Sequence, residues 1–518
     1  MPIGPDLPSV SMLAQIAADH GISLDAGQAA AYRGLMAGLI RSCRRIEEFP
    51  EPKLPVKYPR TPGYRPHPGE NPFNGWYWRC EIRGADDGVL KGQRVAIKDA
   101  VPVAGVPMTN GSRILEGFVP DIDAAIVTRI LDAGGTIIGK TNCEDFSFSG
   151  GGHTCSHGPV SNPHNPARNP GGSSNGSAVV LVTGQADLAI GGDQGGSIRL
   201  PASWSGVYGL KPTYGLVPYT GCAMIEATLD HVGPMANTTE GVARLLTAIA
   251  GSDPFDPRQR GAIPPGFPTD YMPALTRGVA GLRIAIVREG FGHSGEDTGS
   301  PPSDPEVDRR VTEAIRSFRK LGATVEEISI PMHLDAFHIW NVVATEGAAD
   351  FVLRGAGIGT NWLGYYNTAL ADALARGMQS RPDDLAPPVK LVLFCGDYMR
   401  RSYHGRYYGK AQNLRYLAND AYESALARYD LLAMPTIPFT ATPMVARDAS
   451  IEETVVTALN MIRNVCVANL TGHPAISLPC GMLDGLPIGL MLTGRRFEDD
   501  KLIAASAAFE ASGNWRKM

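Results

Sequence analysis

Two short turns of glycine and serine hold the residues best suited to carry out chemistry. Residues 171–174 read GGSS and residues 195–197 read GGS, and the apolar segment between them has first a helical and then an extended pattern. Glycine allows positive φ angles and close approach of other groups, so each turn can aim a hydroxyl and several N–H groups at one point. Acyl transfer needs this convergence, because a nucleophile and an oxyanion pocket must meet at one carbonyl.

Lys98 is the candidate base for such a serine. A serine hydroxyl is a weak nucleophile without a base. Residues 95–97 (VAI) read as a buried strand that ends on Lys98, and Pro102 closes the following loop. Lysine acts as a base only when neutral, and burial lowers its reference pKa of about 10.4. A buried lysine also needs a polar partner, and a bridging hydroxyl would be one.

Residues 172–176 (GSSNG) also fit the G-x-S-x-G pattern of a nucleophile elbow, with Ser174 at its tip. An elbow directly follows a strand, whereas residues 165–170 (NPARNP) contain two prolines and favour a loop. We therefore prefer Ser173 and Ser197 as the reacting serines. An α/β-hydrolase esterase built around Ser174 stays open as the alternative with a different fold.

Three motifs resemble the signature of the amidase signature family, whose members combine GGSS[GS]GSA, GGSIR and G-x-x-G-x-K-P-T with a lysine on an upstream strand. The matching segments are residues 171–178 (GGSSNGSA), 195–199 (GGSIR) and 206–213 (GVYGLKPT). One departure is Asn175, where glycine or serine is usual. The likeness extends over most of residues 75–500 and is strongest to bacterial amidases with an N-terminal helical extension.

The resemblance implies roles for the matching residues. Ser197 would be the acyl nucleophile, Ser173 a bridging serine on a cis peptide bond, and Lys98 the general base. Backbone N–H groups would form the oxyanion hole, namely those of Gln194, Gly195, Gly196 and Ser197. Three further residues would orient the serines and the loop: Ser174, Asp193 and Arg199. The acyl pocket would be lined by Phe146, Phe148, Gly150, Ile225 and Trp340.

A cluster of histidine and cysteine is the one candidate for a metal site. It comprises His153, Cys155, His157 and His164. These residues lie in a Gly/Pro/Asn-rich loop without a second ligand pair, so we expect no metal there. The resemblance implies no cofactor either.

Strand and helix patterns alternate around these motifs. Residues 94–98 and 136–139 read as strands with a helix at 124–133 between them, and the same order recurs over residues 282–330. Such alternation favours a sheet with helices on its faces. We expect an α/β fold, a mixed β-sheet core flanked by helices, over residues 76–518. Residues 429–435 read as a further strand, and residues 469–479 and 485–492 resemble the closing strands of the family.

The N-terminal part reads as a small appended domain, residues 1–75. Residues 8–48 have two helical stripes with a cap near Asp25, and residues 49–75 form a linker rich in proline and glycine. By resemblance to the related amidases this domain is a dimerisation arm, so we expect a homodimer. The alternative is simple packing onto the main body.

Composition limits the kinds of partner. The 518 residues are 43% hydrophobic and 19% charged, with a net charge of -5, so we expect neither nucleic acid nor an anionic membrane as a partner. The first residues show no signal peptide, and no apolar stretch is long enough to span a bilayer. Eight scattered cysteines without a C-x-x-C pair fit a reducing compartment. We therefore expect a cytoplasmic enzyme with a small-molecule substrate.

The leading hypothesis is an amide hydrolase that converts carboxamides to a carboxylic acid and ammonia or an amine through an acyl-enzyme. A carbamate, aryl-anilide or ester hydrolase on the same scaffold is the alternative within the family, and a glutamine-hydrolysing component of an amidotransferase is another. An inactive binding scaffold is the alternative from a different class. Such a scaffold would be expected to lose Lys98, Ser173 or Ser197, and all three are present.

Overall fold

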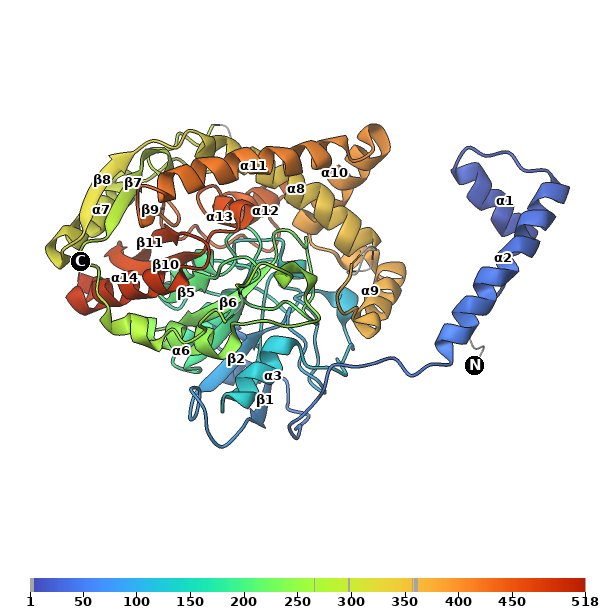
Figure 1. The fold of residues 1–518 in the computed structure, drawn as a ribbon, viewed down its shortest axis with the longest axis horizontal. Coiled ribbons are helices and arrows are strands. Elements are labelled where there is room, and N and C mark those ends of the chain that lie inside the picture. Colours follow the sequence, from blue (N-terminus) through green and yellow to red (C-terminus); the bar gives the residue numbers. More distant parts are fainter. Residues whose placement is uncertain (1–3, 265, 297–298, 356, 358–361, 518) are drawn as a thin grey trace. The chain divides into compact units, whose positions relative to one another are not determined.

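The structure is a computed structural model that describes residues 4–264, 266–296, 299–355, 357 and 362–517 (Figure 1). The chain divides into two units, Met1–Leu54 and Pro55–Met518. The division falls within the Pro/Gly-rich linker of residues 49–75, because the linker residues from Pro55 onward belong to the larger unit. Lys57 forms an ion pair with Asp132 at 2.7 Å, and Tyr64 forms an isolated β-bridge with Arg79.

The smaller unit is a pair of helices, α1 (Val10–Asp19) and α2 (Ala26–Glu47). Asp25 caps α2 with its side chain, which accepts from the N–H of Gln28 at 2.7 Å, while the Gln28 side chain accepts from the N–H of Asp25. This capping box satisfies two N–H groups at the helix start. The cap expected near Asp25 is therefore present.

The larger unit is built on a mixed sheet of eleven strands, counted over the described residues. In spatial order the strands are β1 (Trp76–Arg83), β3 (Thr136–Thr141), β2 (Arg94–Lys98), β4 (Leu188–Asp193), β6 (His231–Ala236), β5 (Tyr208–Lys211), β10 (Ala475–Leu483), β11 (Leu486–Gly494), β9 (Leu431–Pro435), β7 (Arg283–Val287) and β8 (Thr324–Ile328). Strand β2 is parallel to both β3 and β4. The carboxyl ends of β2 and β4, where Lys98 and Asp193 lie, therefore meet at one edge of the sheet.

Helices cover both faces of this sheet (Figure 1). The helices of the larger unit are α3 (Ala125–Asp132), α4 (Asn175–Val182), α5 (Arg199–Ser205), α6 (Thr239–Ile249), α7 (Pro305–Ser317), α8 (Met332–Ala348), α9 (Thr368–Ser380), α10 (Pro387–Tyr403), α11 (Arg406–Leu426), α12 (Ile451–Leu459), α13 (Cys466–Thr471) and α14 (Asp499–Ser512). Helices α3, α6, α7 and α14 pack on one face, and α4 and α5 on the other, with α8, α11 and α13 packed beyond them.

The alternation of side chains along β2 explains this layering. Val95 and Ile97 belong to the core under α3 and α6, whereas Ala96 packs with α4 and α5 on the opposite face. Successive residues of a strand point to opposite faces, and all three side chains are fully buried. The end of β2 is therefore shielded from solvent, and so is the side chain of Lys98 there.

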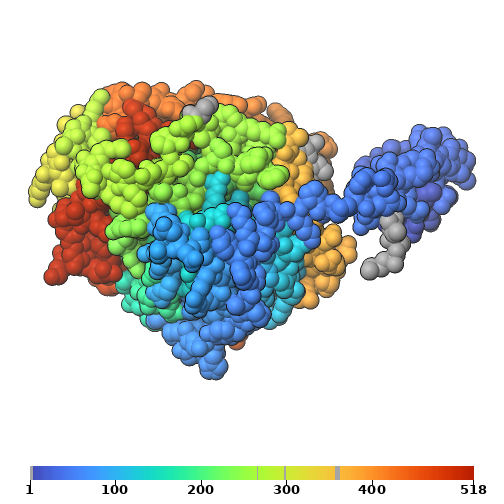
Figure 2. Space-filling view, turned by 60° about the horizontal axis from the view of Figure 1, so that its bottom comes forward, coloured from blue at the N-terminus to red at the C-terminus, as the bar shows by residue number. Residues whose placement is uncertain are grey.

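Segments far apart in sequence share the surface of the larger unit. Figure 2 shows blue residues from its start, green residues from its middle and red residues from its end lying against one another. Strand β10 pairs with β5, and β9 pairs with β7, so the sheet joins distant parts of the chain. Residues 55–518 therefore form one structural unit.

The α/β fold expected from the sequence is confirmed, with a strand at residues 94–98 as predicted and β7 at residues 283–287, at the start of the alternating pattern over residues 282–330. The expectation of a strand beginning at residue 469 was wrong. Residues 466–471 form α13, and β10 begins only at Ala475. Asn469 faces the buried polar centre described below, a tertiary contact that overrides local extended propensity. Across the described ranges, no helix has the length and apolar character needed to cross a membrane.

Candidate active site

Lys98 lies at the end of β2 with no exposed surface. Its Nζ donates a hydrogen bond of 2.7 Å to Oγ of Ser173. Burial lowers the pKa of Lys98 to about 8, against the opposing effect of nearby groups such as Asp193 and Glu144. Lys98 is therefore neutral, as a base requires, far more often near neutral pH than an ordinary lysine is.

Ser173 lies in the turn that leads into α4, and the Gly172–Ser173 peptide bond is cis. The turn packs tightly against the start of α5. A Cβ on Gly171, which has a φ of +83°, would lie 2.6 Å from Cα of Pro201. Only glycine fits this position, so the GGSS turn is held close to the chain that carries Ser197.

Ser174 connects the two serine turns. Its N–H donates to the carbonyl of Ser197 at 3.2 Å. Its hydroxyl donates to the carbonyl of Gly192 and accepts from the N–H of the same residue, at 3.2 and 3.1 Å. Ser174 is fully buried and is absent from the cavity lining described below. This position is unsuitable for the tip of a nucleophile elbow, which must present its hydroxyl to a substrate.

Ser197 lies on the turn between β4 and α5 and lines the cavity described below. Over the described residues, no hydrogen bond joins its hydroxyl to that of Ser173. The backbone N–H groups of Gln194, Gly195 and Ser197 have no acceptor in the part of the chain that the structure describes. Gly196 differs, because its N–H donates to Oδ1 of Asp193 at 2.8 Å. Three of the four predicted oxyanion donors are thus unengaged, and the fourth supports the turn instead.

A buried polar centre holds the shape of this turn. The carboxylate of Asp193 accepts from the N–H groups of Gly196 and Ile198 and from Arg199, at 2.8 to 3.1 Å. Asn469 on α13 donates to the carboxylate and the carbonyl of Asp193, and its own Oδ1 accepts from Arg199 at 2.8 Å. Burial alone would raise the pKa of Asp193, but Arg199 holds it well below the ordinary value.

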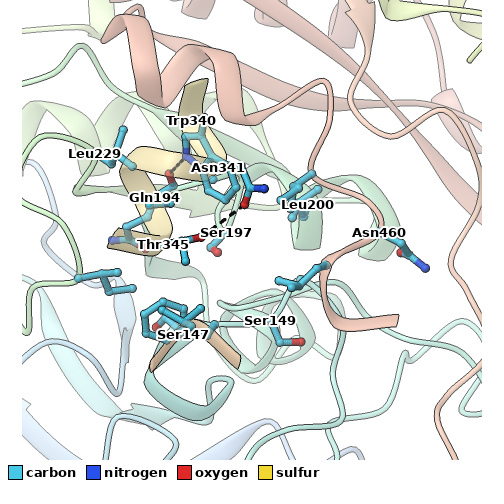
Figure 3. A pocket seen from close by; sticks show the side chains of 18 of the residues that line it. Ser147, Ser149, Gln194, Ser197, Leu200, Leu229, Trp340, Asn341, Thr345 and Asn460 are labelled. Carbon is cyan, nitrogen blue, oxygen red and sulfur yellow. Dashed lines mark hydrogen bonds between the residues drawn. The ribbon is translucent and has the colours of Figure 1, made fainter. Parts of the chain in front are cut away.

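The cavity beside Ser197 has a volume of about 300 Å³. Figure 3 shows its lining side chains around Ser197, with Trp340 and Leu229 on one side and Asn460 on another. The lining comprises Ser147, Phe148, Ser149, Gly150, Gln194, Gly195, Ser197, Leu200, Ile225, Glu226, Leu229, Gly299, Phe337, Trp340, Asn341, Ala344, Thr345, Val392, Val455, Val456, Leu459, Asn460 and Ile462. Most of these side chains are apolar, so the cavity fits an apolar group.

Four of the five predicted pocket residues line this cavity: Phe148, Gly150, Ile225 and Trp340. Phe146 is absent from the lining. Its backbone has a φ of +45°, and its side chain is buried in a cluster with Met108 and Ile114. Positive φ is uncommon for a residue with a large side chain, and no local sequence signal announces it here.

Trp340 both lines the cavity and forms a hydrogen bond to the turn that bears Ser197. Its Nε1 donates to the carbonyl of Gln194 at 2.8 Å (Figure 3). A Cβ on Gly195 would lie 2.3 Å from Cζ2 of the indole. Helix α8 is therefore joined to the turn that bears the unengaged N–H groups.

The histidine and cysteine cluster in residues 153–164 is dispersed in the structure. The His153 ring contacts the carbonyl of Thr454, whereas the His164 ring contacts that of Ser205. His157 is hydrogen-bonded to Thr109 and stacks on Tyr77. Among the described residues, no group of three or more His, Cys, Asp or Glu side chains could hold a metal ion.

Comparison with known proteins agrees with this geometry. A family model described as Amidase matches residues 78–503. An enantioselective amidase from Rhodococcus rhodochrous is 44% identical over 91% of this chain and 89% of its own length. A glutamyl-tRNA(Gln) amidotransferase subunit from Methanosarcina mazei is 37% identical over 83% of this chain and 86% of its own. The solved structure of native peptide amidase from Stenotrophomonas maltophilia has a TM-score of 0.67 and 30% identity, covering 82% of this chain and 83% of that one.

The chain belongs to the amidase family. It is a hydrolase that acts on amide C–N bonds.

Proposed function

We propose that this chain hydrolyses carboxamides through an acyl-enzyme on Ser197, with Ser173 passing protons between Ser197 and Lys98. The observation that carries the proposal is the 2.7 Å contact between Lys98 and Ser173. It joins a buried lysine of lowered pKa to a serine turn packed against the chain of Ser197. Ser197 in turn faces an apolar cavity.

The reaction would begin with neutral Lys98 taking the hydroxyl proton of Ser173. Ser173 takes that of Ser197, whose Oγ forms a bond to the amide carbon. The oxyanion accepts hydrogen bonds from the N–H groups of Gln194, Gly195 and Ser197. As the C–N bond breaks, Ser173 gives a proton to the departing nitrogen and regains one from Lys98. Water then attacks the acyl-enzyme by the same proton path, releasing the acid and restoring Ser197.

The roles of the supporting residues follow from their contacts. Asp193 and Arg199 fix both ends of the turn, and Ser174 joins the turn to β4. Removing one oxyanion donor from such a site typically lowers kcat by about 10²–10³. A displacement of this turn that moves a donor away from the oxyanion would therefore lower kcat. The unengaged N–H groups favour acyl transfer over binding alone.

A fluorophosphonate probe tests the assignment, because it reacts with activated serines. The purified protein is labelled and the modified peptide is located by mass spectrometry. We expect the label on Ser197, and loss of the label in Lys98→Ala. Ser177→Ala is the matched control, since Ser177 is a nearby buried serine that bonds to the carbonyl of Ile190 at 2.9 Å and lies outside the cavity lining; it should keep the label. Label on Ser174, or none on folded protein, would overturn the proposal.

Esters and carbamates stay as alternative substrates on the same scaffold, since the attack of Ser197 is common to all three and only the leaving group differs. Turnover of an amide, an ester and a carbamate with the same acyl group separates them. We expect the amide to be hydrolysed.

We also propose that the protein resides in the cytoplasm. All eight cysteines are free thiols, six of them buried. Proteins of oxidising compartments commonly pair their cysteines, whereas thiols persist under reducing conditions. Fractionation of cells that produce the full chain tests this.

We propose that α2 mediates a homodimer. Leu35, Leu39 and Ile46 lie on one face of α2 at helical spacing and are 77%, 64% and 69% exposed. A second copy presents the same stripe, so two α2 helices can cover each other symmetrically.

A further inference from the structure

The cavity beside Ser197 has one ionisable side chain in its described lining, Glu226. The other polar lining groups are neutral serines, amides and a threonine. The described lining contains no lysine or arginine. The residues that the structure does not describe are also neither lysine nor arginine. Among the described lining residues, Glu226 is therefore the one whose side chain can carry a full charge.

Glu226 is held in one orientation by three donors. The hydroxyl of Tyr408 donates to Oε1 at 2.7 Å, and the N–H and hydroxyl of Thr228 donate to Oε2 at 2.8 and 2.5 Å. Burial raises the pKa of Glu226, and these donors and the charge of Arg415 oppose the rise. An ionised carboxylate only accepts hydrogen bonds. The three donors directed at the two oxygens of Glu226 therefore favour its ionised form.

Arg415 partly offsets this charge from behind Thr228. It donates to the carbonyl of Thr228 at 3.0 Å and to Oε1 of Gln412 at 3.4 Å. Glu226 belongs to the cavity lining, whereas Arg415 does not. The arrangement places a negative charge at the wall and its compensating positive charge beyond it.

We propose that Glu226 makes this cavity select amides with uncharged, apolar acyl chains and reject those whose acyl group carries a carboxylate. The inference rests on the proposed function, because it assigns the acyl group to this cavity. An acyl chain that ends in a carboxylate would lose the hydration of that carboxylate on entering the cavity. The described lining offers it no cationic partner, and the negative charge of Glu226 would repel it. Each of these effects disfavours binding. Glutamine, with its α-carboxylate, falls in the rejected class.

Glu226→Gln tests the charge with little change in shape. The amide oxygen can still accept hydrogen bonds, but the negative charge is gone. Arg415 then lacks its counter-charge, so the same wall becomes favourable for an anion. The substitution should therefore shift discrimination toward anionic acyl groups, which a purely structural role of Glu226 would not do.

Two substrates of equal size supply the readout, 5-methylhexanamide and glutaramate. They have the same number of heavy atoms, and one ends in an isopropyl group where the other ends in a carboxylate. The ratio of their kcat/KM values isolates the terminal charge. In the wild type we expect the neutral amide to be preferred by about 100-fold or more, and in Glu226→Gln we expect the ratio to fall by about tenfold or more.

Glu346→Gln is the matched control. Glu346 is a buried carboxylate outside the cavity lining, on α8 next to Gly347, which packs against Glu226. Its substitution removes the same charge nearby and should leave the ratio within about twofold of wild type. An equal change of the ratio in both variants would show a diffuse field effect and overturn the role of Glu226.

The outcomes separate this inference from the proposed function. Loss of turnover of the neutral amide by the wild type would contradict the proposed function. If the wild type hydrolysed both amides with a ratio of kcat/KM values near one, the inference would be overturned and the proposed function would stand. This outcome needs no variant. A folded Glu226→Gln protein with an unchanged ratio would overturn it as well. Thermal unfolding of each variant establishes that it is folded.

Discussion

Asp193 and Arg199 form a bidentate ion pair in which neither side chain has any exposed surface. Asp193 is the last residue of β4 and Arg199 the first of α5. The pair therefore closes the turn that presents Ser197 and the N–H groups of Gln194 and Gly195. The geometry of that turn depends on a charge pair that water cannot reach.

Arg199→Met tests this dependence. The substitution leaves the Asp193 carboxylate buried without its cation, which typically destabilises a protein by about 3–5 kcal/mol. We expect a loss of this size in the free energy of unfolding, measured by urea denaturation, together with loss of amide turnover. Arg309→Met is the control, since the Arg309–Glu306 pair on α7 is about half exposed at Arg309 and should change stability by less than about 1 kcal/mol. Equal effects of the two variants would contradict the special role of the buried pair.

The pH dependence of turnover should follow Lys98. The lysine acts when neutral, so protonation at low pH removes the base and kcat/KM rises with pH. With a pKa of about 8, the rise should have its midpoint near pH 8 in a profile measured with an amide that does not ionise. Burial also raises the pKa of Asp230 to about 8, so Asp230→Asn is needed as a control. A rise that persists in Asp230→Asn supports Lys98, and one that disappears there assigns the titration to Asp230.

Trp340→Phe should lower kcat more than it raises KM. The phenyl ring keeps apolar contact with the cavity and with Gly195, but the Nε1 donor to the carbonyl of Gln194 is lost. A buried acceptor left without its partner costs about 1–3 kcal/mol, a cost borne here by the oxyanion turn. Steady-state kinetics with a good amide substrate gives the two constants. Trp204→Phe removes an indole donor to the carbonyl of Phe439 outside the cavity lining; it should cost stability while kcat stays near wild type.

Disruption of the exposed stripe on α2 should yield a monomer. Leu35→Asp combined with Leu39→Asp places two carboxylates in the stripe without touching the larger unit. We expect light scattering after gel filtration to show half the mass of the wild type, with amide turnover retained per active site. Ala30→Asp adds a carboxylate at an exposed position off this stripe and should leave the dimer intact. A wild-type mass of a single chain would rule out the dimer itself.

The sequence was informative wherever the chemistry is local. The strand that ends on Lys98 was predicted with its observed bounds, because apolar β-branched residues before a charged one are a strong local pattern. The fold class followed from alternating patterns of the same kind. The contact between Lys98 and Ser173 supports the site geometry expected from the family motifs.

Contacts between segments far apart in the chain could not be predicted from local sequence patterns. Asn469 lies 276 residues from Asp193 in sequence, and its segment was read as a strand because it resembles one of the closing strands of the family. The engagement of the Gly196 N–H by Asp193 depends on how the turn folds back on the end of β4. Phe146 lies outside the cavity lining and has a positive φ that no local pattern predicts. Glu226 has no motif at all, and only the assembled cavity identifies it.

The residues proposed to break the amide bond and those that surround the acyl group come largely from different parts of the chain. Lys98, Ser173 and Ser197 lie within the first 200 residues, whereas much of the cavity wall comes from Ile225 onward, including α8 and α12. Mutations in the later segments can therefore change which amides are accepted without altering the bond-breaking groups. Directed evolution of new substrate preferences in this scaffold should accordingly find its productive mutations after residue 224, and a library confined to residues 98–199 should yield mostly inactive enzymes.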